Sequence, residues 1–254
     1  MTKIIALLNL KGGVGKTTTA INLAAALQLE GKRVLAIDLD GQSNLTESFG
    51  LSIEEPQTVY GAMKGEYPLP FVQMECGVWI VPSCLDLSAA ESELINEPGR
   101  ELILRDLIAE IPAKNRFDYI LIDCPPSLGF LTLNALTAAH SLIVPMQAQY
   151  LAMRGMAKIL NVVEIVRKRL NPSLKMGGVL ITQYNKRKTL NKSVSELIKE
   201  AFCDKVFQTI IRDNITLAEA PTQGKTIFEY NNKSNGAMDY RALAKEVLVL
   251  QGLV

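Results

Sequence analysis

Residues 3–18, KIIALLNLKGGVGKTT, decide the fold, because an apolar run passes here directly into a glycine-rich loop. The run Lys3–Asn9 is apolar almost throughout, which is typical of a strand buried on both faces. After the loop, a helical pattern extends over Thr17–Glu30. A strand, a glycine loop and a helix in this order form a phosphate-binding unit.

The residue types of this loop match the chemistry of a nucleoside triphosphate. Glycines allow backbone N–H groups to turn toward phosphate oxygens, and the helix N-terminus adds partial positive charge. Lys16 is spaced to reach the β- and γ-phosphates, and the Thr17 hydroxyl to bind Mg²⁺. We therefore expect ATP and Mg²⁺ as cofactors, with the phosphates held by Lys11, Gly12, Gly13, Val14, Gly15, Lys16, Thr17 and Thr18.

The loop is a variant of the usual phosphate-binding pattern. Gly-x4-Gly-Lys-[Ser/Thr] has glycine where this chain has Leu10, and it reserves no place for a lysine at Lys11. Lys11 therefore needs an explanation of its own. A dinucleotide site is disfavoured, because the pair Lys16-Thr17 belongs to triphosphate chemistry and not to a pyrophosphate resting on glycines.

The rest of the chain alternates short β-branched runs with helical patterns. This alternation predicts an α/β fold with a predominantly parallel twisted sheet and helices on both faces, in a single domain over residues 1–254. The expected strands are Lys3–Asn9, Arg33–Asp38, Val78–Pro82, Tyr119–Asp123, Ser141–Pro145, Met176–Thr182 and a short one near Val206–Thr209. The expected helices are Thr17–Glu30, Arg100–Ile111, Thr132–Ala139, Ala152–Leu170, Ser193–Phe202 and Ala237–Leu250, and we interpret Leu51–Gly77 as loop with one short helix.

Composition favours a cytoplasmic protein. Lys and Arg number 27 and Asp and Glu 26, so a nucleic-acid surface would have to come from local clustering of charge. No apolar run approaches the ~20 residues of a membrane span. The cysteines form no Cys-x-x-Cys pair, as expected of reduced thiols in a cytosol, and are Cys76, Cys84, Cys124 and Cys203.

Carboxylates follow two further strands. Asp38 ends the strand Arg33–Asp38 and Asp40 follows it by two residues, so by the alternation of strand residues they point the same way. Asp123 ends the apolar strand Tyr119–Asp123, where a carboxylate can hold Mg²⁺ through water. We expect Thr17 and Asp123 at the metal.

These motifs resemble the ParA/Soj branch of the ParA–MinD family of deviant Walker ATPases. The resemblance covers nearly the whole chain and includes Lys11–Thr18, Asp38-Leu39-Asp40 with Gln42, Asp123-Cys124-Pro125-Pro126-Ser127 and Glu219-Ala220-Pro221 with Gly224-Lys225. It implies that Lys11 reaches the partner's nucleotide in an ATP-sandwiched dimer. It also implies that Asp40 orients the attacking water and that Asp38, with Asp123, supports Mg²⁺. The catalytic residues are then Lys11, Lys16 and Asp40.

The chain departs from the family pattern at several positions. Leu10 stands where the family usually has Gln, Gly41-Gln42-Ser43 where it has Pro-Gln-Gly, and Ile211 where it has Pro before the arginine that corresponds to Arg212. Replacement of Pro by Gly41 loosens the backbone next to Asp40, which bears on the hydrolysis rate. We expect adenine contacts at Gln183, Asn185 and Arg212.

The resemblance implies an ATP-dependent dimerisation switch that binds non-specific nucleoid DNA, hydrolyses ATP when a ParB-like adaptor stimulates it, and partitions a plasmid or chromosome. Such DNA contacts are made to phosphates and depend on salt. Basic residues gather late in the chain, and the candidates for these contacts are Lys186, Arg187, Lys188, Arg212, Lys225 and Lys233.

Other functions of the same fold are weaker interpretations. A MinD-like membrane switch would need a basic amphipathic C-terminal helix, but Leu243–Val254 holds only Lys245, so no stable membrane association is expected. An electron carrier similar to the nitrogenase iron protein would need a second cluster cysteine spaced for Cys124. A carboxysome-positioning ATPase of the same family remains an alternative, because the adaptor determines the cargo.

Overall fold

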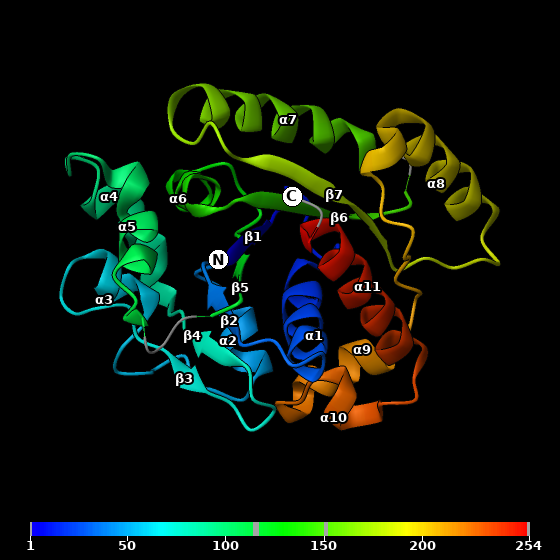
Figure 1. Cartoon of the computed structure of the whole chain (residues 1–254), viewed down its shortest axis with the longest axis horizontal. Coiled ribbons are helices and arrows are strands. Elements are labelled where there is room, and N and C mark those ends of the chain that lie inside the picture. Colours follow the sequence, from blue (N-terminus) through cyan, green and yellow to red (C-terminus); the bar gives the residue numbers. More distant parts are fainter. Residues whose placement is uncertain (1, 114–116, 150–151, 253–254) are drawn as a thin grey trace.

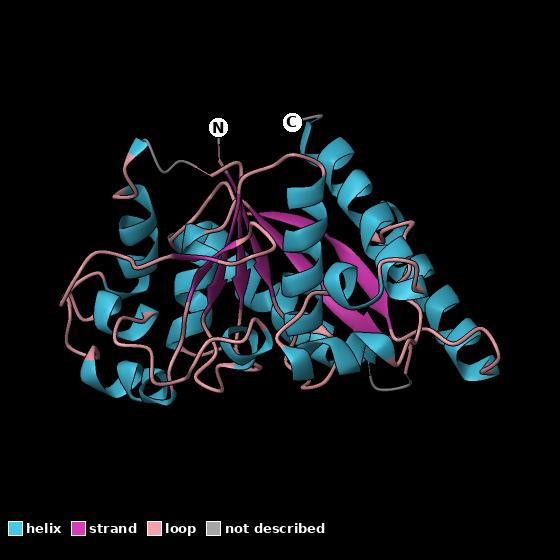
Figure 2. Ribbon diagram, turned by 90° about the horizontal axis from the view of Figure 1, so that it is seen from below, coloured by secondary structure: helices cyan, strands magenta, loops and turns pink. Residues whose placement is uncertain are grey.

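A mostly parallel sheet forms the centre of the molecule, which is a computed structural model that describes residues 2–113, 117–149 and 152–252 (Figures 1 and 2). Within those residues the sheet has seven strands in the order β3-β4-β2-β5-β1-β6-β7. Every neighbouring pair is parallel except β3 with β4, which confirms the expected fold class. The strands are β1 Lys3–Leu7, β2 Val34–Asp38, β3 Val72–Gln73, β4 Trp79–Val81, β5 Tyr119–Asp123, β6 Ser141–Gln147 and β7 Lys175–Thr182.

Helices cover both faces of the sheet, as the alternation of strands and helices predicts. In Figure 1, α7 lies above the sheet and α1 and α11 lie below it. The α-helices are α1 Lys16–Leu29, α2 Asn44–Ser48, α3 Val59–Met63, α4 Ala90–Glu93, α5 Ile103–Ala109, α6 Phe130–Ala138, α7 Ala152–Arg169, α8 Thr189–Phe202, α9 Thr216–Glu219, α10 Ile227–Asn231 and α11 Asn235–Gly252. Short 3₁₀ helices span η1 Leu85–Ala89, η2 Arg100–Leu102, η4 Cys203–Lys205 and η5 Ala220–Gln223.

The alternation of side chains along β1 builds two apolar cores. Ile4 and Ala6 pack into the core under α5, α6 and α7, whereas Ile5 and Leu7 pack into the core under α1 and α11. Both faces of the strand are therefore buried, which explains why its sequence is apolar without interruption.

Two segments differ from the expectation. The stretch Leu51–Gly77 contains a helix, α3, but also the edge strand β3, which turns back onto β4 through Gly77 at φ 83°. The expected strand near Val206–Thr209 is wrong: Val206 makes one isolated bridge with Val179. Phe207 N and Ile211 N still donate to Val179 O and Ile181 O of β7, but between them the N–H groups of Gln208 and Thr209 donate to the Glu246 carboxylate of α11, so no continuous strand forms.

The predicted helices are present with shifted ends. The segment Arg100–Ile111 divides into η2 and α5, and α8 begins at Thr189. Of the C-terminal segment Leu243–Val254, the last two residues lie outside the described ones. None of the helices in the described ranges combines the length and apolar character that crossing a membrane requires.

The parallel order brings the carboxyl ends of six strands to one edge of the sheet. The register pairs Leu7 of β1 with Asp123 of β5, and Asp38 of β2 with the same Asp123. On the other side of β1, Gln147 at the end of β6 pairs with Thr182 at the end of β7. The glycine loop that follows β1 therefore lies between two carboxylates and a group of polar side chains.

Candidate nucleotide site

The glycine loop has an open interior. Gly13 and Gly15 have φ of 70° and 86°, a left-handed conformation that glycine adopts without strain. A Cβ atom added at Gly12 or Gly13 would meet nothing within 4 Å. Among the described residues, none accepts a hydrogen bond from the backbone N–H groups of residues 12–15. Unpartnered N–H groups at the start of a helix are the donors that a phosphate requires.

Side chains from β6 and β7 hold the loop's carbonyl groups. Thr182 Oγ1 donates to Val14 O at 2.7 Å, and Gln183 Nε2 donates to Gly13 O at 2.8 Å. Gln147 Nε2 donates to the same Gly13 O at 3.0 Å and also bonds Gln183 Oε1. Because these carbonyl oxygens are already bonded, the peptide planes of the loop are fixed before a nucleotide binds.

Thr17 and Asp123 are in direct contact at the edge of the sheet. Thr17 Oγ1 donates to Asp123 Oδ2 at 2.6 Å, and Lys16 beside it is buried with 7% of its surface exposed. The other oxygen, Asp123 Oδ1, is buried without a hydrogen-bond partner. A buried carboxylate oxygen without a partner is costly unless a cation or water completes the site.

The electrostatics of the two buried carboxyls also favour a cation. Burial raises the pKa of the Asp123 carboxyl to about 8, and the charge of Asp38 adds to the rise, although the bond from Thr17 and the charge of Lys16 oppose it. Burial likewise raises the pKa of Asp38 to about 6, against the hydrogen bonds from Thr46. A divalent cation offsets the burial and the mutual repulsion that raise these two pKa values, so both carboxyls ionise when it binds.

The residues therefore fit Mg²⁺. Thr17 and Asp123 supply hard oxygen atoms, and Asp38 lies within electrostatic range of Asp123. No cluster of three or more His, Cys, Asp or Glu side chains able to hold a metal occurs in the described part of the chain. Such a sparse set suits Mg²⁺, which keeps several waters and takes phosphate oxygens as ligands.

Asp38 also organises the segment that follows β2. Its Oδ2 accepts hydrogen bonds from Thr46 N at 2.9 Å and Thr46 Oγ1 at 2.7 Å. Thr46 Oγ1 in turn accepts from Ser83 N at 2.9 Å, and Ser83 Oγ donates to Asp40 O at 2.9 Å. Asp38 thus holds the start of α2, whereas the carboxylate of Asp40 bonds only to Gln42 N among the described residues, at 3.0 Å.

Gly41 has a packing reason to be glycine. A Cβ atom at this position would clash with Ser88 Oγ and lie 3.2 Å from Ser88 N, both in η1. A residue with a side chain could be accommodated only if η1 moved. Gly41, which stands where the ParA/Soj pattern usually has proline, is therefore closely packed against Ser88 next to Asp40.

Lys11 is exposed and its ammonium group lies at the end of β6. Lys11 Nζ donates to Gln149 Oε1 at 2.5 Å and to Gln147 Oε1 at 3.2 Å. Its backbone N–H donates to Asn9 Oδ1 at 3.0 Å, which ties the beginning of the loop to β1. Lys11 and Lys16 therefore occupy different places: Lys16 is buried near the carboxylates and Lys11 is held by neutral amides at the rim.

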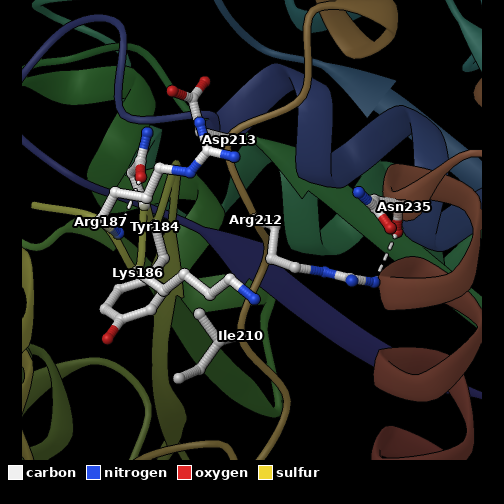
Figure 3. Close-up of a pocket in the computed structure, with 8 residues that line it drawn as sticks. Tyr184, Lys186, Arg187, Ile210, Arg212, Asp213 and Asn235 are labelled. Atoms are coloured by element: carbon white, nitrogen blue, oxygen red, sulfur yellow. Dashed lines mark hydrogen bonds between the residues drawn. The ribbon is translucent and has the colours of Figure 1, made fainter.

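A hollow of about 270 Å³ lies beside the loop, and we call it the base hollow. Gln183 and Arg212, two of the three residues expected at adenine, are among its lining residues, whereas Asn185 is not. Asn185 lies in a neighbouring hollow of about 490 Å³, the basic hollow, shown in Figure 3. The base hollow is lined by Gly15, Thr18, Thr182, Gln183, Ile211, Arg212, Asp213, Asn214, Ile215, Leu217, Ala218 and Tyr240.

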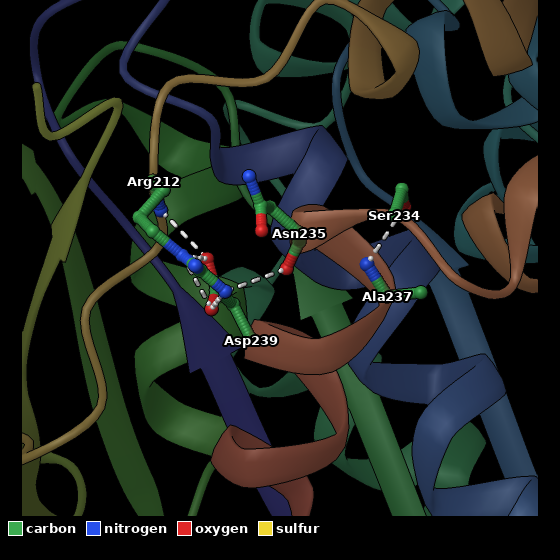
Figure 4. Close-up of polar contacts among 5 residues, drawn as sticks. All are labelled: Arg212, Ser234, Asn235, Ala237 and Asp239. Carbon is green, nitrogen blue, oxygen red and sulfur yellow. Dashed lines mark hydrogen bonds and ion pairs between the residues drawn. The ribbon is translucent and has the colours of Figure 1, made fainter.

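The basic hollow contains part of the predicted DNA-binding set. It is lined by Tyr184, Asn185, Lys186, Arg187, Ile210, Arg212, Asp213 and Asn235. Arg212 points away from Lys186 and Arg187 in Figure 3, and its guanidinium is bound to the carboxylate of Asp239 with a shortest distance of 2.6 Å (Figure 4). Lys188 directly precedes α8, and Lys225 and Lys233 flank α10, a helix that lies apart from α8 in Figure 1.

Several contacting residues were not identified from the sequence. Gln147 and Gln149 follow the predicted strand Ser141–Pro145, and Thr182 ends the strand Met176–Thr182. Polar residues at the carboxyl ends of parallel strands lie at the ligand-binding edge of the sheet, and this position could have identified them. Tyr240 had no such signal, because it lies in the middle of α11 and reaches the site only through packing of that helix against α1.

The open glycine loop, the buried lysine and the paired carboxylates define a P-loop nucleotide-binding protein. A profile described as an AAA domain matches residues 2–176. The chain is 43% identical to the sporulation initiation inhibitor protein Soj of Bacillus subtilis, over 97% of this chain and 98% of that protein. It is 46% identical to the chromosome-partitioning ATPase Soj of Thermus thermophilus, over 96% and 94% of the two chains.

A solved structure resembles the whole chain. Cobyrinic acid a,c-diamide synthase from Mycobacterium smegmatis, with bound ADP and magnesium, has a TM-score of 0.88 and 36% identity, over 99% of this chain and 96% of that one. The chain belongs to the AAA-domain family of the Soj/ParA chromosome-partitioning ATPases.

Proposed function

We propose that this protein is a Mg²⁺-dependent ATPase that acts as a dimerisation switch in the partition of a chromosome or plasmid. The observation that supports the nucleotide part most directly is the bond of 2.6 Å between Thr17 and Asp123 next to a loop whose N–H groups have no partner among the described residues. A relative with 36% identity was crystallised with ADP and magnesium. In this proposal, residues 1–254 form a single domain that carries the whole function.

In this proposal each residue of the site has one task. The loop N–H groups and Lys16 bind the phosphates, while Thr17 and Asp123, with Asp38 behind them, hold Mg²⁺. When bound, Mg²⁺ supplies positive charge to the phosphate oxygens. Asp40 orients the attacking water, because its carboxylate is less buried than that of Asp38 and has one oxygen without a hydrogen-bond partner among the described residues. Lys11 completes the site of a second subunit.

The DNA part of the proposal rests on three basic residues in the loop 183–188 between β7 and α8, which we call the α8 loop. Lys186, Arg187 and Lys188 are exposed, and no carboxylate forms an ion pair with them among the described residues. Exposed cations on a loop suit the sequence-independent binding of phosphates. We infer that the protein is cytoplasmic and nucleoid-associated, and that a ParB-like adaptor stimulates hydrolysis.

Dimerisation links ATP to DNA in this proposal. Lys225 and Lys233 flank α10, which lies apart from α8 within one subunit. Two subunits would double the number of phosphate contacts, so DNA should be retained with ATP and released with ADP. Because each phosphate contact contributes about −0.9 to the slope of log affinity against log salt, a dimer should show a steeper slope than a monomer.

The test compares two triple variants in retention of a non-specific duplex. Replacement of Lys186, Arg187 and Lys188 by Ala should lower both the ATP-dependent affinity and the salt slope. The matched control replaces Arg167, Lys168 and Arg169, three exposed cations at the end of α7, and should bind as the wild type does. Equal losses in both variants would mean that total charge, and not the α8 loop, determines retention. If the wild type bound DNA equally well with ATP, with ADP and without nucleotide, the proposed ATP-dependent switch would be refuted.

A further inference from the structure

Gly41 directly follows Asp40 and is buried. Its φ is not positive, so the backbone conformation at this position does not require glycine. Glycine places no restraint of its own on the chain, whereas proline, which the ParA/Soj pattern usually has here, fixes φ. In this chain the position of Asp40 therefore depends on contacts from other segments.

The segment that follows β4 supplies the first of these contacts. Ile37 of β2 pairs in parallel with Val81 of β4, so the residues that come after the two strands lie side by side at the edge of the sheet. Ser83 is fully buried, and its Oγ donates to Asp40 O at 2.9 Å. Its backbone N–H donates to Thr46 Oγ1, also at 2.9 Å. Ser83 thus holds the loop after β2 at both of its ends.

The same two ends of the loop are bonded to Asp38. Asp40 N donates to Asp38 Oδ1 at 3.2 Å. Thr46 Oγ1 donates to Asp38 Oδ2 at 2.7 Å, so the hydrogen of this hydroxyl is in use and its oxygen is the acceptor for Ser83 N. Asp38 therefore holds the loop from β2, and Ser83 holds it from the neighbouring strand.

Ser88 supplies the second contact, because η1 packs directly on Gly41. A Cβ atom at Gly41 would clash with Ser88 Oγ and lie 3.2 Å from Ser88 N. Ser83 and Ser88 belong to one short stretch of chain, which bonds the carbonyl oxygen of Asp40 and packs on the next residue. Contacts with one segment at two points hold the peptide group between Asp40 and Gly41 in one orientation.

We propose that Ser83 is a positioning residue for ATP hydrolysis, which acts with the packing of Ser88 on Gly41 by fixing the backbone of Asp40. This proposal rests on the role of Asp40 proposed above and adds the source of its restraint. The segment after β4 replaces the restraint that a proline after Asp40 would give. Because a misplacement of about 1 Å can cost about 10²-fold in rate, a hydroxyl that acts only through the backbone can change turnover.

Ser83→Ala tests the bond to Asp40 by single-turnover hydrolysis and by titration with a fluorescent ATP analogue. Asp40 O keeps the bond from Ser43 N at 2.9 Å, so the variant leaves no unpartnered carbonyl and should fold. We expect a rate about tenfold lower with unchanged affinity for Mg-ATP. The matched control is Ser195→Ala, a buried serine of α8 whose hydroxyl donates to Lys192 O at 2.8 Å. A wild-type rate in Ser83→Ala, or equal losses in both variants, would overturn the proposal.

Gly41→Ala tests the packing on η1. The added Cβ should displace Ser88 or the Asp40 peptide group and lower the rate without weakening ATP binding. Adding Ser88→Ala removes the clashing hydroxyl and leaves contacts of 3.2 Å or more, so the double variant should recover most of the rate. Gly155→Ala in α7 is the control, because its Cβ would meet nothing within 4 Å. A wild-type rate in Gly41→Ala would remove Ser88 from the proposal.

The background of Asp40→Ala separates this proposal from the proposed function. Once the carboxylate is absent there is nothing to position, so adding Ser83→Ala should not lower the residual rate further. A further loss in the double variant would mean that Ser83 acts by another route and would overturn the proposal. Full turnover in Asp40→Ala alone would instead refute the role of Asp40 itself.

Discussion

Lys11 Nζ donates a hydrogen bond of 2.5 Å to Gln149 Oε1, so within one subunit this lysine is held at the end of β6 and not among the buried groups around Lys16. Its partners are neutral amides in an exposed setting. Water competes for the ammonium at this exposed position, and a phosphate carries the negative charge that the amides lack, so a partner's phosphate can replace these bonds. The arrangement is consistent with a lysine that acts on a second subunit.

Replacement of Lys11 by Ala should leave ATP binding intact and abolish ATP-dependent dimerisation. The phosphates of the same subunit are held by the loop and Lys16, whereas the proposed contact of Lys11 is made across the interface. Light scattering with ATP measures the dimer, and a fluorescent nucleotide measures binding. Lys245→Ala, at an exposed position of α11, is the control. An ATP-dependent dimer of the Lys11 variant would disprove the role in trans.

Replacement of Lys16 by Ala should weaken Mg-ATP binding strongly. A charge-assisted hydrogen bond contributes about 1.5–3 kcal/mol, which corresponds to roughly a 10- to 100-fold loss of affinity. Titration with a fluorescent ATP analogue measures the loss. If Lys16→Ala bound Mg-ATP as tightly as the wild type, the loop would not be the phosphate site.

Replacement of Asp40 by Ala should retain ATP binding and lose turnover. The Asp40 carboxylate bonds only Gln42 N among the described residues, so its removal leaves Asp38 and Thr46 in place. Loss of a group that positions the attacking water lowers the rate by about 10²-fold or more. Single-turnover kinetics separate the two effects. If Asp40→Ala bound ATP more weakly but hydrolysed each bound ATP at the wild-type rate, Asp40 would help to bind ATP and would not orient the attacking water.

Asp123 makes the stability of the metal-free protein depend on pH. Its pKa is raised to about 8 from 3.8, so the folded protein keeps a proton that the unfolded chain loses between these values. Stability from this group is therefore present at low pH and is lost as pH rises through that window, with a slope of at most about 1.4 kcal/mol per pH unit. Asp123→Asn should flatten this fall in urea unfolding without Mg²⁺.

The control for Asp123→Asn is Asp106→Asn, which replaces an exposed carboxylate of α5 and should leave the pH dependence unchanged. Added Mg-ADP should stabilise the wild type more than Asp123→Asn, because the wild type gains the ligand that its unpartnered oxygen requires. If Mg-ADP stabilised both proteins equally, Asp123 would not be a ligand of the metal.

His140 should produce a pH dependence of the opposite sign. Ile4 N donates to His140 Nδ1 at 3.0 Å, so this nitrogen must be unprotonated in the folded protein. Burial, with the charge of Lys3, lowers the pKa of His140, and the stabilisation is therefore present above the ordinary pKa of about 6.5 and is lost as pH falls below it.

We expect the difference in unfolding free energy between the wild type and His140→Gln to decrease from about pH 7 to pH 5. The chain has a single histidine, so no other imidazole contributes to this difference. A difference that stayed constant over this range would mean that the bond to Ile4 survives protonation of the side chain, and the proposed tautomer would be wrong.

The local parts of the molecule could be predicted from sequence. The uninterrupted apolar run of β1, the loop glycines and the carboxylates at strand ends each follow from short-range rules: burial on both faces, left-handed φ at glycine, and the common edge of parallel strands. The expected strand near Val206–Thr209 failed because Glu246, distant in sequence, binds the N–H groups of Gln208 and Thr209.

The tertiary structure alone decided the contacts between segments that are far apart in the chain. Sequence placed Arg212 at adenine and DNA, but only the packing of α11 shows that its guanidinium is bound by Asp239. Likewise, only the fold brings Gln149 to Lys11 and Tyr240 to Thr19. Residue type and spacing determine backbone geometry and the chemistry available at strand ends. The partners of long polar side chains depend on how helices pack, which no local pattern encodes.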